Sequence, residues 1–175
     1  TTWEGGVRVP SIIKFPNGLK PRIVSEPVMG IDWMPTFASI TDSKLSKNKI
    51  DGKNIWPLLS GKTNKSPHKK LYFYYRVNEL HSIRMDEWKI HFKRTYRSLN
   101  GKNGGKDGMP VKYDMNLLEK NELYNLKNDP EERNNVYDDF PEIVLMMEKL
   151  GIKAREELGD NLTDVIGKEN REARK

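Results

Sequence analysis

The sequence predicts an α/β chain in two parts: a first part over residues 1–65 that needs further strands to complete a sheet, and a smaller C-terminal subdomain over residues 66–175. Segment 7–15 is rich in β-branched residues, which favours one strand, but nothing before it supplies the partner strands that a sheet needs. Beyond residue 70, short aromatic-rich segments precede a strongly periodic helix. We therefore expect the second part to be an antiparallel sheet packed by a C-terminal helix.

The first part contains one predicted strand and one predicted helix. In the strand, Pro10 must lie at the start or at an edge, because proline donates no hydrogen bond to a ladder. Asp32 is a candidate N-cap, and Pro35 is tolerated in the first helical turn. Asp51-Gly52 marks a turn. The expected apolar face of the helix comprises Trp33, Phe37 and Ile40.

The second part begins with three predicted strands, over residues 71–75, 82–85 and 88–92. The last two are separated by a two-residue gap, which predicts a hairpin although the gap lacks the glycine that such turns prefer. A glycine-rich segment over 101–108 predicts a flexible loop, and residues 122–126 predict a further strand. Together these strands predict the antiparallel sheet.

The last predicted element is an amphipathic helix that begins at Pro141. Proline suits the first helical position, and Glu142 suits the positive end of the helix dipole. Gly159 follows the last periodic residue and marks the end of the helix. The apolar positions recur at helical spacing and are Ile143, Met147, Leu150, Ala154 and Leu158.

Composition limits the possible classes of function. The 175-residue chain carries a formal net charge of +6 and no cysteine, which excludes disulfides and thiolate metal sites. No stretch approaches the roughly 18 consecutive apolar residues that a membrane span requires, so we expect none. Positive charge is concentrated in segment 93–112, which is either a solvated basic loop or a surface for a polyanion.

No combination of side chains in the sequence predicts a catalytic centre. No serine occupies a nucleophile elbow, and the three histidines lack the spacing of metal ligands. Paired carboxylates lie near helix ends or on helix surfaces, where capping and solvation explain them. We therefore expect this chain alone to be inactive, with no catalytic residue and no metal ligand of its own. The histidines are His68, His81 and His91.

Residues 1–10, Thr-Thr-Trp-Glu-Gly-Gly-Val-Arg-Val-Pro, follow the pattern K-x-T-x-(Y/W)-E-G-G-x-R-x-P from its first Thr onwards. This long and unusual pattern resembles the signature of the type I sulfatases, the arylsulfatase A-like branch of the alkaline phosphatase superfamily. Further similar segments follow in the order of that family. They cover residues 31–37, 51–61, 83–89, 122–132 and 154–160.

The resemblance implies a sulfate ester hydrolase with an alkaline-phosphatase-like α/β domain. In that family a cysteine in a C-x-(P/A)-x-R box becomes formylglycine, the nucleophile, and Asp and Asn side chains hold calcium. Both lie upstream of the region that resembles this chain, and a sulfate-binding Lys stands a residue or two ahead of the first Thr. We therefore expect the C-terminal portion of a longer enzyme, with the calcium ligands outside this chain. We also expect an aryl or carbohydrate sulfate as substrate, and an exported (periplasmic or extracellular) or lysosome-like location.

The resemblance also suggests two sets of supporting residues. The first set would brace the expected Lys through a tight Glu-Gly-Gly turn, or else its members are ordinary residues at the entry to a strand. The second set would form a cationic rim at the mouth of the substrate site, since arginine recognises oxyanions bidentately. The first set is Thr2, Glu4, Gly5, Gly6 and Arg8, and the second is His91, Lys93, Arg94 and Arg97.

Two other functions remain open from the sequence. One is a sister hydrolase of the superfamily that acts on phosphate or phosphonate esters. The other is a non-catalytic module that binds nucleic acid or glycosaminoglycan through segment 93–112. No nucleic-acid-binding motif is present, so we expect as partners a sulfated small molecule or carbohydrate and the N-terminal part of the same enzyme.

Overall fold

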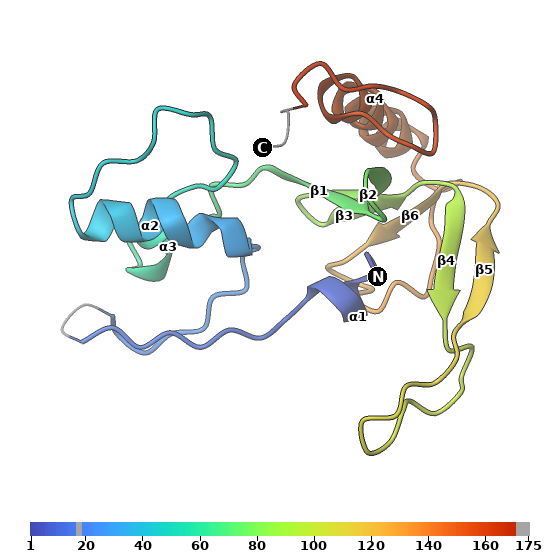
Figure 1. Ribbon diagram of the computed structural model, residues 1–175, viewed down its shortest axis with the longest axis horizontal. Helices are drawn as coiled ribbons and strands as arrows, with labels where there is room; N and C mark the ends of the chain where they lie inside the picture. The colour runs from blue at the N-terminus through green and yellow to red at the C-terminus, as the bar shows by residue number, and fades with distance from the viewer. Residues whose placement is uncertain (17–18, 171–175) are drawn as a thin grey trace. The chain divides into compact units, whose positions relative to one another are not determined.

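The computed structural model describes residues 1–16 and 19–170 and divides into two compact units (Figure 1). The first unit combines Thr1–Val9 with Lys70–Lys175, and the second is Pro10–Lys69. Sequence analysis placed the N-terminal segment with the first part of the chain. In the structure this segment packs with the C-terminal sheet instead, because its aromatic and acidic side chains contact residues of the strands.

The first unit is built on a four-stranded antiparallel sheet with the strand order β1-β2-β3-β6. These strands are β1 (Lys70–Tyr75), β2 (Glu79–Met85), β3 (Trp88–His91) and β6 (Glu122–Asn125). All three neighbouring pairs are antiparallel. The four predicted strands and the antiparallel sheet are therefore confirmed, with ends that differ slightly from the prediction.

The β2–β3 hairpin has the predicted two-residue turn. Met85 pairs with Trp88, and Asp86 between them has a φ of 52°. Aspartate tolerates this left-handed conformation because its short side chain hydrogen-bonds locally. The turn therefore forms without a glycine.

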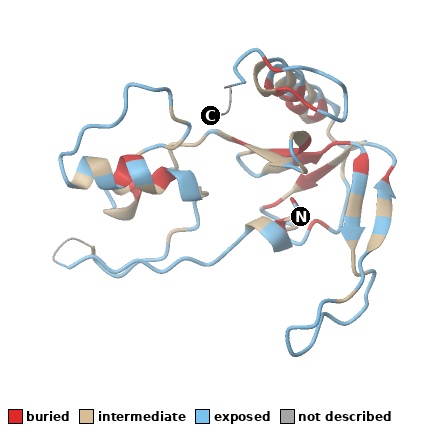
Figure 2. Ribbon diagram, viewed as in Figure 1, coloured by how far each residue is buried: buried red, intermediate tan, exposed pale blue. Residues whose placement is uncertain are grey.

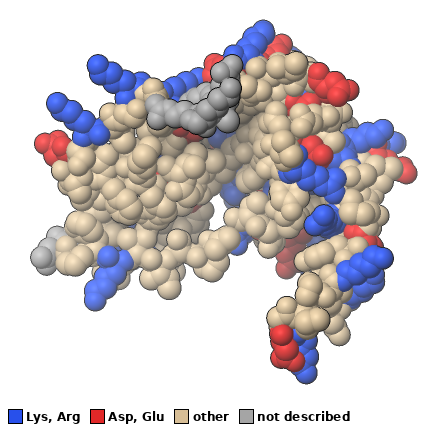
Figure 3. All heavy atoms as spheres, in the orientation of Figure 1, with Lys and Arg blue, Asp and Glu red and all other residues tan. Residues whose placement is uncertain are grey.

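A separate two-stranded ribbon consists of β4 (Arg94–Ser98) and β5 (Asp114–Leu118). Sequence analysis did not predict this ribbon, because β4 is mostly polar and lacks an apolar alternation. The glycine-rich segment lies in the connection between the two strands, as the predicted loop requires. Figure 3 shows Lys and Arg side chains over the ribbon and its loop, with acidic side chains among them.

Helix α4 (Pro141–Leu158) confirms the predicted C-terminal helix and has proline in its first turn. Its apolar face covers β2 and β3, and the buried residues of Figure 2 gather where helix and sheet meet. Met147 and Ala154 are fully buried there. The buried core comprises Leu80, Ile83, Ile90, Phe92, Leu123, Val144, Met147 and Ala154.

The second unit contains only short helical elements among its described residues. They are the 3-10 turn η1 (Gly30–Asp32), helix α2 (Trp33–Ile40) and helix α3 (Trp56–Leu59). The helix predicted after Asp32 is confirmed as α2. Its expected apolar face is not buried in this unit, since Phe37 is 57% exposed whereas the polar Thr36 is fully buried.

The strand predicted over residues 7–15 is wrong. Residues 8–15 have no regular secondary structure, and the side chain of Ile12 is 98% exposed. A strand needs partners for its backbone N–H and C=O groups, and no described strand pairs with this segment. Pro10 also lacks a donor, so β-branched composition alone does not make a strand here.

Asp32 anchors the second unit through a different role from the predicted N-cap. Its buried carboxylate accepts the backbone N–H of Lys53 at 2.8 Å and lies 2.8 Å from Nε2 of His68. The neighbouring Gly52 approaches the backbone so closely that a Cβ there would lie 2.1 Å from the carbonyl oxygen of Ile31. The Asp-Gly turn is therefore required for close packing between two segments of this unit.

The exposed apolar side chains of the second unit predict that the isolated 175-residue chain self-associates. Ile12 and Ile23 are almost fully exposed, and burial of apolar surface drives association. Sedimentation velocity should show concentration-dependent oligomers, and the variant with Ile12→Ser and Ile23→Ser should show fewer. A monodisperse wild-type chain that melts cooperatively would contradict this prediction.

Candidate functional site

The N-terminal segment forms a short helix, α1 (Glu4–Val7), where a tight turn was expected. Glu4 is buried, and Gly5 and Arg8 are exposed. Gly6 lies against the first residue of the segment, because a Cβ on it would be 2.1 Å from Cγ2 of Thr1. The helix therefore needs glycine at Gly6, whereas a Cβ at Gly5 meets no atom within 4 Å.

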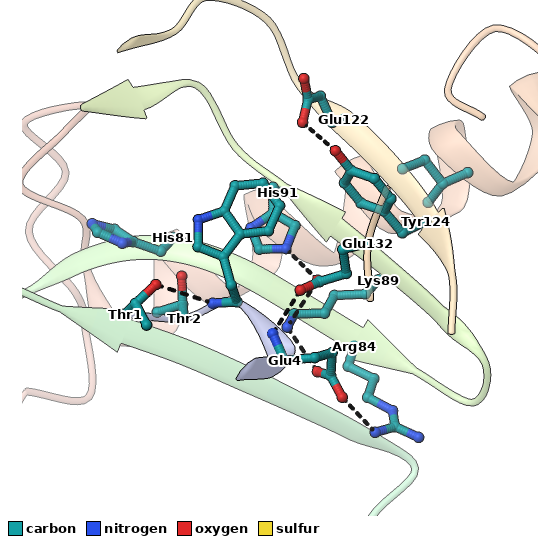
Figure 4. A network of polar contacts seen from close by, with 12 residues as sticks. Thr1, Thr2, Glu4, His81, Arg84, Lys89, His91, Glu122, Tyr124 and Glu132 are labelled. Atoms are coloured by element: carbon teal, nitrogen blue, oxygen red, sulfur yellow. Dashed lines mark hydrogen bonds and ion pairs between the residues drawn. The ribbon is translucent and has the colours of Figure 1, made fainter. Parts of the chain in front are cut away.

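A buried network of charged side chains joins α1 to the sheet (Figure 4). Lys89 of β3 is fully buried, and its Nζ donates to Oε1 of Glu4 at 2.8 Å. The same Nζ lies 3.1 Å from Oε1 of Glu132. The other carboxylate oxygen of Glu132 accepts the backbone N–H of Glu4 at 2.6 Å. One lysine thus holds together two carboxylates that are far apart in the sequence.

His91 extends this network in a single tautomer. Arg94 donates from Nη2 to Nδ1 of His91 at 2.8 Å, so Nδ1 is the acceptor. Nε2 therefore carries the proton and donates to Oε1 of Glu132 at 2.7 Å. Burial lowers the pKa of His91 to about 4, against the opposing effect of the Glu132 hydrogen bond. At neutral pH the imidazole is a neutral link between a guanidinium and a carboxylate.

Glu132 remains ionised in this environment. Burial by itself would raise the pKa of Glu132, but the hydrogen bond from His91 and the charge of Lys89 outweigh it and lower the pKa. Glu4 has a second cationic neighbour, because Nη1 of Arg84 lies 3.7 Å from its Oε2. The network therefore contains enough positive charge to balance its two buried carboxylates.

Arg94 lies in the interior of the unit. Its Nη1 donates to the carbonyl oxygens of His81 and Phe92, both at 2.9 Å, and its Nη2 lies 3.3 Å from Oγ1 of Thr2. Burial lowers the pKa of Arg94 to about 10, so the group stays charged at neutral pH. Arg94 therefore holds the side chain of Thr2 in place from the interior of the unit.

The four residues expected at a substrate rim are split by the structure. His91 and Arg94 are buried, so they cannot form an exposed rim in this unit. Lys93 and Arg97 are exposed, and their place at a substrate rim stays a prediction. The expectation fails for the first pair because β3 and β4 turn their side chains toward α1 instead of toward solvent.

Trp3 completes the contact between α1 and the sheet. Its indole stacks on the imidazole of His91 with 4.0 Å between ring centroids, and Tyr124 meets the indole edge-on. The guanidinium of Arg94 lies 5.5 Å from the centroid of the Trp3 ring, within the range of a cation–π interaction. Aromatic contacts to Trp3 and charged contacts to Thr2 and Glu4 therefore hold the same short segment against the sheet.

Sequence analysis missed the roles of Lys89, Glu132 and Arg84, although all three lie in segments quoted for the family resemblance. Each was treated as part of a separate motif. A charged residue inside an otherwise apolar strand, such as Lys89 in β3, was the available signal, because a buried charge requires a partner. The partner itself was not predictable, since Glu4 and Lys89 are separated by most of the N-terminal half of the chain.

A small pocket opens beside this network, between the N-terminal segment, the β1–β2 turn and β4. Its volume is about 30 Å³. The lining is basic and hydroxylic, with three arginines and two threonines. The main lining residues are Thr1, Thr2, Arg76, Arg94, Tyr96 and Arg97.

The described part of the chain, residues 1–16 and 19–170, has neither a metal-binding cluster of acidic, histidine or cysteine side chains nor a membrane-spanning helix. Across these two stretches, no three His, Cys, Asp or Glu side chains are grouped so that they could hold a metal ion. No helix in the same stretches has the length and apolar character needed to cross a membrane.

The family model for the C-terminal region of aryl-sulfatase matches residues 66–171, more than half of the chain. The chain belongs to this sulfatase family. A second model, for the C-terminal part of N-sulphoglucosamine sulphohydrolase, matches residues 1–100. The family resemblance inferred from the sequence motifs is therefore confirmed.

Individual relatives agree with this assignment. Arylsulfatase A from Bos taurus is 31% identical over 147 residues, which covers 82% of this chain and 29% of the relative. Arylsulfatase H from Homo sapiens is 39% identical over 98 residues, covering 51% of this chain and 17% of the relative. The chain thus spans less than a third of the length of these sulfatases.

One solved structure supports the fold. It comes from a study of glycosaminoglycan metabolism by Bacteroides thetaiotaomicron and superimposes with a TM-score of 0.50 at 22% identity. The match covers 71% of this chain and 24% of the other. The combination of antiparallel sheets and a C-terminal helix is therefore shared with a region of that structure.

Removing the buried lysine tests the network. Lys89→Met should lower the free energy of unfolding by about 3–5 kcal/mol, because two carboxylates stay buried without their cation. Chemical denaturation measures the change, and Glu132→Gln in the same background should restore part of it. Lys93→Met is the matched control at an exposed lysine and should change stability by less than about 0.5 kcal/mol. Equal losses at both lysines would contradict the prediction.

Acidification should destabilise the first unit through His91. The folded pKa of about 4 lies below the usual value of 6.5, so the unfolded chain binds more protons between these two values. The contribution of His91 to the free energy of unfolding is therefore fully present above pH 6.5. It decreases as the pH drops toward 4, by on the order of 2–3 kcal/mol at pH 4.5.

The control for this pH effect is His91→Gln, which keeps a hydrogen-bond donor but does not titrate. Unfolding free energies measured at pH 7.5 and pH 4.5 should differ less in this variant than in the wild type. The same difference in both proteins would show that His91 is not the group responsible.

Proposed function

We propose that the protein containing this chain hydrolyses sulfate esters, and that this chain supplies a positioning scaffold instead of the reacting groups. The observation that carries the proposal is the family match over residues 66–171 together with the buried network on α1. The matched relatives are sulfatases, and the sequence pattern around Glu4 resembles the segment that follows their sulfate-binding Lys.

The reacting groups of this proposal lie outside the chain. Formylglycine would supply the nucleophile, and calcium would supply Lewis-acid stabilisation of the sulfate oxygens. Residues 1–65 would complete the alkaline-phosphatase-like α/β domain that carries them. The exposed apolar side chains of Ile12, Ile23 and Phe37 support this, since a neighbouring domain would bury them.

The contribution of this chain is to hold the N-terminal segment in place. Lys89 and Glu132 fix α1 through Glu4, and Arg94 fixes Thr2. A residue one or two positions before Thr1 would be held close to this fixed segment, because consecutive Cα atoms are only about 3.8 Å apart. Electrostatic catalysis needs charged groups that do not reorganise during the reaction, and a braced segment meets that need.

For the substrate we propose an aryl or carbohydrate sulfate. The relatives include arylsulfatases, and one matching family model is named for a sulfatase of N-sulphoglucosamine. The exposed Arg97 supports an anionic substrate, because it lines a pocket together with Thr1 and Thr2 of the braced segment. An exported or lysosome-like location remains a prediction from the family, and fractionation of cells that express the full gene would check it.

Expression of the full-length protein tests the proposal. Purified protein should release sulfate from nitrophenyl sulfate, lose that activity with a calcium chelator, and contain formylglycine by mass spectrometry. Release of phosphate from nitrophenyl phosphate at a higher rate would favour the sister hydrolase. Heparin binding that weakens with salt, without hydrolysis of either ester, would favour the polyanion-binding module.

A test of the positioning role uses Glu4→Gln in the full-length protein. The variant should reduce kcat on nitrophenyl sulfate about tenfold or more, since loss of one preorganising contact weakens electrostatic stabilisation. The exposed Glu131→Gln is the matched control, because it removes a carboxylate in the segment of Glu132 but outside the network. An unchanged kcat in a folded Glu4→Gln protein would contradict the positioning role.

A further inference from the structure

The pocket beside the N-terminal segment brings together three guanidinium groups that lack carboxylate partners. Arg76, Arg94 and Arg97 line it, together with the hydroxyl residues Thr1 and Thr2. Over residues 1–16 and 19–170, none of the three arginines forms an ion pair with a carboxylate. Positive charge gathered in this way attracts an anion, because guanidinium groups bind oxyanions through charge-assisted hydrogen bonds.

Arg94 is the strongest indication of an anion. It is 3% exposed, and its hydrogen bonds go to neutral acceptors, two carbonyl oxygens and Nδ1 of His91 among them. Its Nε is buried and has no acceptor among the described residues. The carboxylate of Glu132 is already engaged by Lys89 and His91. A buried cation without a direct counter-charge is costly, and an anion in the pocket would offset that cost.

Arg76 is held toward the pocket by a strained turn. Arg76 and Val77 connect β1 to β2 with φ values of 48° and 65°, which are unusual for residues other than glycine, asparagine and aspartate. Nη1 of Arg76 donates to Oγ1 of Thr95 at 3.0 Å, which orients the guanidinium against β4. Strain of this kind is common where a side chain must be presented to a ligand.

The remaining walls of the pocket fit a group attached to a sugar. Tyr75 and Tyr96 provide aromatic surface, and His81 provides a ring whose Nε2 is bound to Glu79 at 2.9 Å. Glu79 contacts this ring but does not itself line the pocket. The volume of about 30 Å³ has room for about two water molecules, so it can admit oxygen atoms of one anionic group but not a whole sugar ring.

We propose that this pocket binds a second anionic group of a sulfated saccharide substrate, a carboxylate or a sulfate other than the one that is hydrolysed. Arg76 and Arg97 contact that group, and Arg94 supplies buried positive charge beneath it. The inference rests on the proposed sulfatase function and adds a basis for substrate selection to it. Because Thr1 lines the pocket, the bound group would sit within two residues of the expected sulfate-binding position.

A second and larger depression of the first unit does not suit an anion. It has a volume of about 280 Å³ and lies against α4. Its lining contains acidic and apolar residues and no Lys or Arg, so an anion there would be repelled. The lining residues are Tyr137, Asp138, Pro141, Val144, Leu145 and Glu148.

Binding to the full-length protein tests the proposal without requiring turnover. The probe is a uronate–glucosamine disaccharide with two sulfate groups, titrated by calorimetry into protein from which calcium has been removed. Arg76→Ala and Arg97→Ala should each raise Kd about tenfold, since a charge-assisted hydrogen bond is lost in each. Arg76→Lys and Arg97→Lys, which keep the charge, should lose less.

The matched control removes two positive charges of the same unit that do not line the pocket. Lys112→Ala combined with Arg133→Ala should leave Kd within about twofold, provided that long-range attraction is screened by salt. Weakening equal to that of the Arg76→Ala and Arg97→Ala double variant would overturn the proposal in favour of unspecific attraction. Unchanged Kd in a folded double variant would overturn it as well.

Two analogues of the disaccharide identify the group that enters the pocket. One has its carboxylate reduced to an alcohol, and the other lacks one sulfate. The Arg76→Ala effect should disappear with the analogue that lacks the contacted group, as in a double-mutant cycle. Persistence of the full effect with both analogues would contradict a direct contact. Activity of the wild-type protein on nitrophenyl sulfate separately tests the proposed function, so failure of one proposal does not imply failure of the other.

Discussion

The ammonium group of Lys89 holds α1 against the sheet of the first unit. It is fully buried between the carboxylates of Glu4 and Glu132, which lie 128 residues apart in the sequence. A buried charge is tolerated only when its partners are also in place, so α1, β3 and the segment after β6 must assemble together. Lys89 is therefore the charged centre of the contacts that hold the N-terminal segment, beside those of Trp3 and Arg94.

The need to fix the N-terminal segment in one orientation also explains why this network is polar and not a second apolar core. The sheet already has an apolar core on the side covered by α4. On the other side, the hydrogen bonds from Lys89 to Glu4 and from Arg94 to Thr2 fix the N-terminal segment in one orientation, whereas apolar contacts alone tolerate several. A single orientation of α1 is what the proposed positioning role requires, because preorganised groups must not move during a reaction.

The structure separates two roles for arginine that are indistinguishable in the sequence. Arg94 lies inside the unit, where it supports Thr2 and His91, whereas Arg97 is exposed at the pocket. Both lie in the same basic segment and were assigned to one substrate rim. Alternation along β4 turns the first inward and the second outward, so three residues of sequence separate a structural cation from a surface cation.

The sequence by itself determined the family, the four strands of the main sheet and the helix at Pro141, because motifs, period and turn residues are local signals. It failed at residues 7–15, where β-branched composition predicted a strand that has no partner, and at the β4–β5 ribbon, whose polar strands have no local signature. Only the tertiary structure brought together Glu4, Lys89 and Glu132, or Arg76 and Arg97. The physical reason is that side-chain pairing across a fold depends on which surfaces meet, and a charged residue in one motif carries no information about its partner in another.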